Sequence, residues 1–168
     1  TYEIDTLILA TGFDAMTGAL TSIDIIGRGG AKLKDQWETG AKSYLGLGIA
    51  NFPNLFTVTG PGSPSVLSNM MPSIEQHVNW ITDCIDWMET NDKKVIESSK
   101  TAEDEWMVLV NEIADMTIFT DTKSWYNGSN IDSKAKAFLP FIGVPVYAEM
   151  LEEVVTEDYK GFIFDRPN

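Results

Sequence analysis

Few residues in this sequence have the type and spacing that metal or nucleophilic catalysis requires. His77 is the only histidine and Cys84 the only cysteine, so a metal site with several nitrogen or sulfur ligands is not available. Ser63 lacks the second flanking glycine of a nucleophile elbow. Asp83 and Asp86 fall on one side of a predicted helix and are interpreted as a solvated face. We therefore expect no catalytic residue and no metal site in this chain.

The best candidate for a ligand site is a stretch that joins a strand, a loop and a helix. An apolar run ends at Gly60, a loop rich in Gly, Pro and Ser covers 61–68, and a helix begins within 69–73. The apolar residues of this helix recur every three or four positions and predict its buried face: Ile74, Val78, Ile81, Ile85 and Met88. A helix N-terminus presents unpaired N–H groups and the positive end of a dipole, which favours an anion or an electron-rich ring. His77, beside the apolar face, is expected at the helix surface or the edge of the core.

The rest of the chain predicts an α/β fold. Extended segments are predicted at 2–10, 54–59 and 159–164, and a short strand with a glycine turn predicts a hairpin near 23–30. Residues 90–101 are polar and charged and are predicted to form a loop. Further helical segments are predicted at 35–37, after a cap at Thr101, and from Pro145 onward. The second has an apolar face that includes Trp106, and the third has one that includes Tyr147, Leu151 and Val154. Residues 2–10 become continuously apolar, which is typical of a strand buried on both faces of a parallel sheet.

Composition and charge limit the class of protein. The chain has 168 residues, 43% of them hydrophobic, which fits one folded domain. A formal charge of −13 disfavours binding to nucleic acid or to an anionic membrane. One cysteine and the lack of a long apolar run indicate a soluble protein of a reducing compartment, the cytoplasm. Because the chain starts at Thr1 and enters a predicted strand at once, we expect it to be part of a longer protein.

Several separated blocks of this sequence resemble one family of enzymes. The blocks are DTLILATGFD at 5–14, FPNLFTVTGPGSPSVLSNM at 52–70, SIEQHV at 73–78 and SWYNG at 124–128. In order and approximate spacing they resemble the C-terminal third of the flavin-dependent Baeyer–Villiger monooxygenases of the cyclohexanone and phenylacetone monooxygenase type. The resemblance implies the C-terminal part of a flavoprotein with two dinucleotide-binding domains. Residues 1–168 would then complete the FAD-binding domain and add helices to it.

The resemblance also implies cofactors, a reaction and site residues. Enzymes of this family hold FAD, take a hydride from NADPH and use O₂ to insert oxygen next to a ketone carbonyl, which gives an ester or a lactone. On this mapping the backbone N–H of Met70 would face the pyrimidine edge of FAD, and the indole N–H of Trp125 would bind NADP. The substrate pocket would be lined by Ser65, Val66 and Leu67.

Other motifs of the family are absent from this chain. It contains neither G-x-G-x-x-G fingerprint nor the catalytic arginine of the family. We expect these in an N-terminal remainder, as a segment or a separate chain, without which the chain should be inactive. Two alternatives stay open: a heteroatom-oxidising flavin monooxygenase, and a non-catalytic interaction module that retains the fold.

Overall fold

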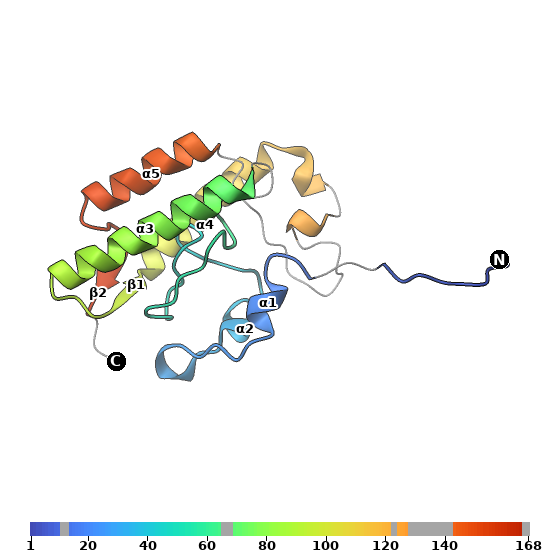
Figure 1. The fold of residues 1–168 in the computed structure, drawn as a ribbon, viewed down its shortest axis with the longest axis horizontal. Coiled ribbons are helices and arrows are strands. Elements are labelled where there is room, and N and C mark those ends of the chain that lie inside the picture. The colour runs from blue at the N-terminus through green and yellow to red at the C-terminus, as the bar shows by residue number, and fades with distance from the viewer. Residues whose placement is uncertain (11–13, 65–68, 122–123, 128–142, 166–168) are drawn as a thin grey trace.

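Three long helices and a small sheet form the larger part of the structure. The computed structural model describes residues 1–10, 14–64, 69–121, 124–127 and 143–165. Its longer helices are α3 (Met70–Thr90), α4 (Lys100–Asp115) and α5 (Val144–Thr156). Two short strands, β1 (Ile96–Ser98) and β2 (Phe162–Phe164), pair in antiparallel fashion, with Glu97 opposite Ile163. Helices α1 (Gly18–Thr21) and α2 (Leu33–Gln36) lie on the other side of the loop that leads to α3 (Figure 1).

Two groups of buried apolar side chains make up the core. The larger group joins α3, α4, α5 and the turn at 44–47, and centres on Trp80, Trp106 and Tyr147. The smaller group joins α2 to the loop that follows it, through Leu33, Trp37, Ala41, Ile49 and Phe52. The loop at 41–57 therefore has one face in each group. The helical turn predicted at 35–37 is observed two residues earlier, as α2 (Leu33–Gln36). The apolar face predicted for α5 is confirmed, since Tyr147, Leu151 and Val154 are buried.

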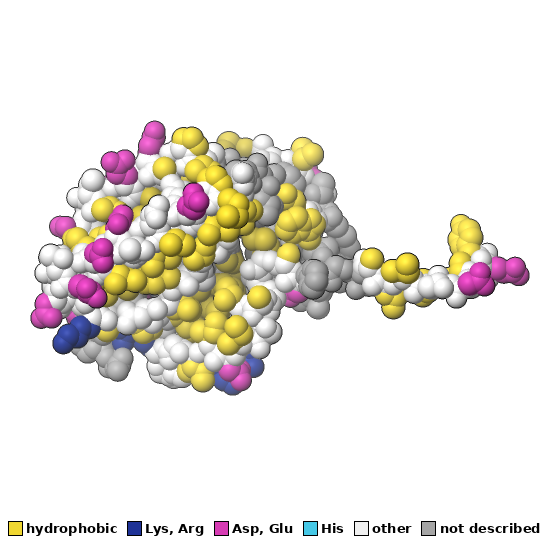
Figure 2. Space-filling model, in the orientation of Figure 1, with side chains coloured by type: hydrophobic (Ala, Val, Ile, Leu, Met, Phe, Trp, Pro, Cys, Tyr) yellow, Lys and Arg dark blue, Asp and Glu magenta, His cyan; other side chains and the backbone are white. Residues whose placement is uncertain are grey.

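The predicted helix α3 is confirmed, but its predicted buried face is only partly right. The buried residues are Ser73, His77, Trp80, Cys84 and Met88, so Met88 lies where it is predicted and the rest of the buried face is turned by one residue from the apolar pattern. Ile81 is partly buried against the core. Two predicted core residues, Val78 and Ile85, are 46% and 43% exposed. The reason is that polar Ser73 and His77 face the core. A band of hydrophobic side chains is consequently visible on the outside of the molecule (Figure 2).

The strand predicted at 2–10 does not form in this structure. These residues are extended but unpaired, and Leu7, Ile8 and Leu9 are 69–82% exposed (Figure 2). A strand buried on both faces depends on neighbouring strands for its hydrogen bonds. Within the described residues, the only paired strands are β1 and β2, and these bind each other. The sequence pattern at 2–10 is therefore that of a strand whose neighbours lie outside the described part of this chain.

Three other local predictions are corrected by the structure. Residues 54–59 form no strand, because Asn54 turns the chain with a positive φ of 57° and its side chain accepts a hydrogen bond from Ile96 N–H. Helix α4 is capped by Ser99, whose hydroxyl accepts from Ala102 N–H at 3.1 Å, and not by Thr101. The hairpin predicted near 23–30 is reduced to one bridge, between Ile26 and Lys32.

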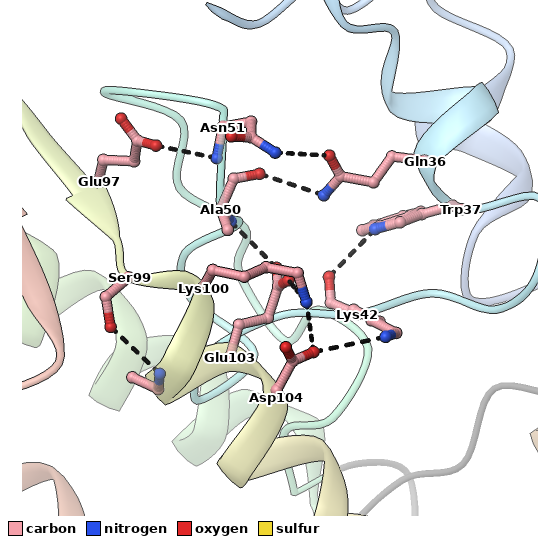
Figure 3. A network of polar contacts seen from close by, with 11 residues as sticks. Gln36, Trp37, Lys42, Ala50, Asn51, Glu97, Ser99, Lys100, Glu103 and Asp104 are labelled. Atoms are coloured by element: carbon pink, nitrogen blue, oxygen red, sulfur yellow. Dashed lines mark hydrogen bonds and ion pairs between the residues drawn. The ribbon is translucent and has the colours of Figure 1, made fainter.

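Two buried carboxylates fix the loop at 41–57 to β1 and α4 (Figure 3). Glu103 accepts from Ala50 N–H and Glu97 accepts from Asn51 N–H, each at 3.0 Å. Glu97 also forms an ion pair with Arg28. Burial raises the pKa of Glu103 above its usual value. The hydrogen bond from Ala50 N–H and the charge of nearby Lys100 lower it, but by less. The ionised form of Glu103 is therefore costly in the folded state.

Glu103→Gln is expected to gain stability relative to the unchanged protein as the pH rises. The folded-state pKa of Glu103 lies above its ordinary 4.5, so its contribution to stability is complete below that pH and is lost as the pH rises through the folded-state pKa. Glutamine keeps the acceptor for Ala50 N–H and does not ionise. Urea titrations at pH 4.5 and pH 8 measure the difference. If the stability of Glu103→Gln relative to the unchanged protein does not increase from pH 4.5 to pH 8, this assignment is wrong.

Candidate functional site

The first part of the loop before α3 is buried and held by hydrogen bonds from distant residues. Gly62 has a φ of +85° and its carbonyl accepts from the indole N–H of Trp106 at 3.0 Å. The carbonyl of Pro61 accepts from the hydroxyl of Ser43. Ser63, fully buried, donates to the Gly60 carbonyl at 2.8 Å. A side chain at Gly62 would stand 3.2 Å from the Trp106 indole nitrogen, so the close approach of loop and α4 requires glycine there.

The N-terminus of α3 leaves one backbone donor for a ligand. The side chain of Asn69 accepts from Met71 N–H at 3.1 Å, and Pro72 has no N–H. The N–H of Met70, the first residue of the helix, has no acceptor among the described residues. Because α3 has 21 residues, the full dipole of a long helix is directed at this end. The geometry suits an electron-rich or anionic group beside Met70, as the sequence predicts.

The other predicted site residues are described only in part. Ser65, Val66 and Leu67, the predicted substrate pocket, lie outside the described residues. Trp125 begins a short 3₁₀ turn (Trp125–Asn127), is 41% exposed and stacks on Tyr126 with ring centroids 4.2 Å apart. Its indole N–H has no acceptor among the described residues, which leaves it available for a ligand. In Figure 1 this turn and the start of α3 lie toward the same end of the molecule.

His77 is fully buried, which corrects the prediction of a surface or core-edge position. Its Nδ1 accepts from Thr59 N–H at 2.9 Å, and its Nε2 lies 2.9 Å from the hydroxyl of Tyr147. Burial lowers the pKa of His77 to about 4. The ring is thus neutral at physiological pH and bonded at both nitrogens, which leaves none of its nitrogens for proton transfer to a substrate.

Lowering the pH from 7 to 5 is expected to destabilise the protein through His77 by about 2 kcal/mol. The folded-state pKa of about 4 lies below the ordinary 6.5, so the unfolded chain takes up the proton first as the pH falls. Stability is therefore present above about 6.5 and is lost as the pH falls toward 4. Urea titrations of the unchanged protein and His77→Gln at both pH values isolate the effect from that of the carboxylates. Equal losses in the two proteins would refute it.

Sequence patterns did not identify the residues that hold the candidate site in place. Trp106 and Tyr147 were predicted as core residues of their helices, and Ser43 was not singled out. Each acts through a hydrogen bond to a residue more than 15 positions away: Trp106 to Gly62, Tyr147 to Leu45 and Ser43 to Pro61. A local pattern cannot show such pairs. The one available signal is that Trp and Tyr require a polar partner when buried.

Metal and membrane sites find no support in the structure. The described residues contain no group of three or more His, Cys, Asp or Glu side chains able to hold a metal ion. None of the described helices is long and apolar enough to cross a membrane.

No protein-family model matches the chain, but individual proteins do. It is 42% identical to a phenazine N-monooxygenase of Lysobacter antibioticus, over 96% of this chain and 30% of that protein. It is 40% identical to a Baeyer–Villiger monooxygenase of Pseudooceanicola batsensis, over 98% of this chain and 30% of that protein. The chain thus spans about 30% of the length of these relatives.

Solved structures agree with the sequence comparison. The structure of cyclohexanone monooxygenase from Rhodococcus sp. Phi1 bound to NADP⁺ superposes with a TM-score of 0.92 at 40% identity, covering 99% of this chain and 31% of that one. A complex of OTEMO with FAD and NADP superposes with a TM-score of 0.88 at 32% identity, covering 97% of this chain and 30% of that one.

The fold is that of the C-terminal part of flavoprotein monooxygenases built from two dinucleotide-binding domains. Within that class, the chain is homologous over nearly its whole length to the Baeyer–Villiger monooxygenases, as the sequence blocks predict.

Proposed function

We propose that this chain forms part of an enzyme that oxidises a ketone to an ester or lactone with NADPH and O₂. The observation that carries the proposal is the junction at 60–70. Residues 60–63 are held by buried hydrogen bonds, and the junction ends in a long helix whose first N–H, that of Met70, has no acceptor among the described residues. Residues 1–168 would complete the FAD-binding domain of this enzyme. The remainder of the same enzyme, with both nucleotide fingerprints, is the partner that the chain requires.

The described residues fit FAD at the start of α3. The pyrimidine edge of a flavin is rich in oxygen and gains negative charge on reduction, so a free N–H at a helix N-terminus is a matching donor. When bound, FAD supplies the reactivity toward O₂ and NADPH supplies the reducing hydride. Met70 N–H would orient the ring and stabilise its negative charge. The fixed residues 60–64 would set the distance between that ring and the substrate pocket formed by Ser65, Val66 and Leu67.

Trp125 fits a contact to NADP. An indole N–H is a donor only, and this one lies on a 3₁₀ turn with 41% of the residue exposed. Stacking on Tyr126 restricts the ring and lowers the entropy that it would lose on binding. Trp125 would thus hold the nicotinamide cofactor at the site through one hydrogen bond. A cytoplasmic location would fit this cofactor pair and the single, buried Cys84.

Cofactor content and ketone-dependent NADPH oxidation test the proposal. We expect the full-length enzyme that contains this chain to purify with about one FAD per polypeptide, and to oxidise NADPH faster when a cyclic ketone is present. A full-length protein that binds no FAD, or that oxidises NADPH at the same rate with and without every ketone tried, would refute it.

Oxidation at nitrogen is a second candidate, favoured by one observation. The relative that is 42% identical to this chain is a phenazine N-monooxygenase. Ketone oxidation requires attack on a carbonyl carbon followed by migration of a carbon substituent, whereas N-oxidation transfers oxygen to a lone pair. Mass spectrometry of the products from a cyclic ketone and from a phenazine offered together distinguishes the two. N-oxide without lactone would assign the enzyme to the second function.

A further inference from the structure

One buried hydrogen-bond chain crosses the base of the candidate site. Thr59 N–H donates to Nδ1 of His77 at 2.9 Å, and Nε2 of His77 lies 2.9 Å from the Tyr147 hydroxyl. The Tyr147 hydroxyl in turn donates to the carbonyl of Leu45. His77 and Tyr147 are both 0% exposed, so water does not compete for these bonds.

Only one protonation state of His77 satisfies all three bonds. An N–H donor at Nδ1 requires a lone pair there, so the ring proton resides on Nε2. Nε2–H then donates to the oxygen of Tyr147, whose own hydrogen goes to Leu45. The neutral Nε2–H tautomer is therefore fixed by its neighbours, and the burial of the ring favours this uncharged form.

The chain of bonds connects four separate segments. Thr59 directly precedes the loop at 60–64, and its φ of +50° is unfavourable for a β-branched residue. His77 lies on the second turn of α3, the helix that follows the same loop. Tyr147 belongs to α5, and Leu45 to the turn at 44–48. One imidazole thus holds the start of the loop against the helix at its end.

We propose that His77 is a positioning residue that sets the conformation of residues 59–64, the described start of the loop, by accepting the Thr59 N–H. The inference rests on the proposed function for what this loop faces, a ketone beside FAD. Without the acceptor at Nδ1, the Thr59 N–H loses the hydrogen bond that helps to offset its unfavourable φ, and the loop is expected to shift at its first residue. The shift is expected in residues 60–64, next to the proposed substrate pocket. It is not expected at Met70 or Trp125, which contact FAD and NADP in the proposed function, because these lie on α3 and on the 3₁₀ turn at 125–127.

Two substitutions separate the two nitrogens of the ring. In His77→Asn the side-chain oxygen takes the position of Nδ1 and can still accept from Thr59. In His77→Gln the amide extends to the position of Nε2 and can still bond Tyr147, but the acceptor for Thr59 is lost. Both variants remove the aromatic ring, so they share its packing cost and differ in which bond they keep.

The test compares the full-length enzyme with these two variants by hydrogen exchange and by steady-state kinetics. In His77→Gln we expect the Thr59 amide to exchange about tenfold faster and the KM for a cyclic ketone to rise about fivefold, the effect of one lost hydrogen bond. The anaerobic rate of FAD reduction by NADPH should stay within about twofold. His77→Asn should restore both the slow exchange and the low KM. Where His77→Gln does not fold, Tyr147→Phe removes the acceptor of Nε2–H and should raise Thr59 exchange in the same direction.

Each result decides a different point. The inference is overturned if His77→Asn and His77→Gln show the same Thr59 exchange rate and the same KM. It is also overturned if neither His77→Gln nor Tyr147→Phe changes the Thr59 exchange rate. If the rate of FAD reduction falls by the same factor as KM rises, the variant has a general structural defect, and the inference is again overturned. If the unchanged enzyme binds no FAD, the proposed function fails, and the Thr59 exchange rate still decides whether His77 holds the loop.

Discussion

Trp106→Ala is expected to lower the free energy of unfolding by about 3–5 kcal/mol. The indole is 4% exposed, contacts Tyr44 edge-on with ring centroids 6.5 Å apart and lies 6.3 Å from the ring of Tyr147. Truncation to alanine leaves a cavity among these rings and removes the donor of the Gly62 carbonyl. A urea titration followed by far-ultraviolet circular dichroism measures the loss.

Trp106→Phe is the matched control for this prediction. Phenylalanine retains most of the aromatic packing but cannot donate to Gly62, so its cost should be limited to a carbonyl left unpaired, about 1–3 kcal/mol. Trp106→Phe should lower the activity of the full-length enzyme by more than this loss of stability suggests, because it releases residues 60–64 from α4. A loss below about 1 kcal/mol for Trp106→Ala would contradict the packing described for this core.

Met70→Pro is expected to lower the two-electron reduction potential of bound FAD by about 30–60 mV. A hydrogen bond to a charged group contributes about 1.5–3 kcal/mol, and 30 mV corresponds to about 1.4 kcal/mol for two electrons. The N–H of Met70 would stabilise the reduced flavin, which carries the negative charge, so its removal makes reduction harder. Potentiometric titration of the full-length enzyme measures this shift.

The fold should tolerate proline at this position. Met70 is the first residue of α3, where the N–H has no helical partner, and Asn69 has φ −64° and ψ 121°, which a residue before proline adopts readily. The Asn69 cap on Met71 N–H is untouched. Met70→Leu is the control, because it changes the side chain and keeps the N–H. Equal potentials in the Pro and Leu variants would show that this N–H does not face the flavin.

Helices could be predicted from the sequence because their signals are local. Helix α3 and the proline near the start of α5 are both confirmed. The face that α3 buries could not be predicted, since Ser73 and His77 are polar and reach the core only because of the folded context. The same applies to β1, which reads as a charged loop. There Glu97 is buried because Arg28 and the Asn51 N–H satisfy its carboxylate.

The start of a helix at Met70 could be predicted from the sequence, but the residues that hold the preceding loop in place could not. A helix start after a Gly-Pro-Ser loop is a local pattern, and the family resemblance supplied a ligand for it. The residues that fix the loop come from α4, α5 and the 41–57 segment. Their partners are set by tertiary contacts, such as the bond of Trp106 to Gly62, which spans 44 residues.

The most direct test of the proposed function is the product that the full-length enzyme forms from cyclohexanone, NADPH and ¹⁸O₂. We expect ε-caprolactone that carries one ¹⁸O atom in the ring, at the position between the carbonyl carbon and the migrating carbon. Two results would contradict the assignment of this chain to a ketone-oxidising enzyme. One is lactone that contains no ¹⁸O. The other is that the FAD-loaded enzyme oxidises NADPH while cyclohexanone and the other cyclic ketones are recovered unreacted.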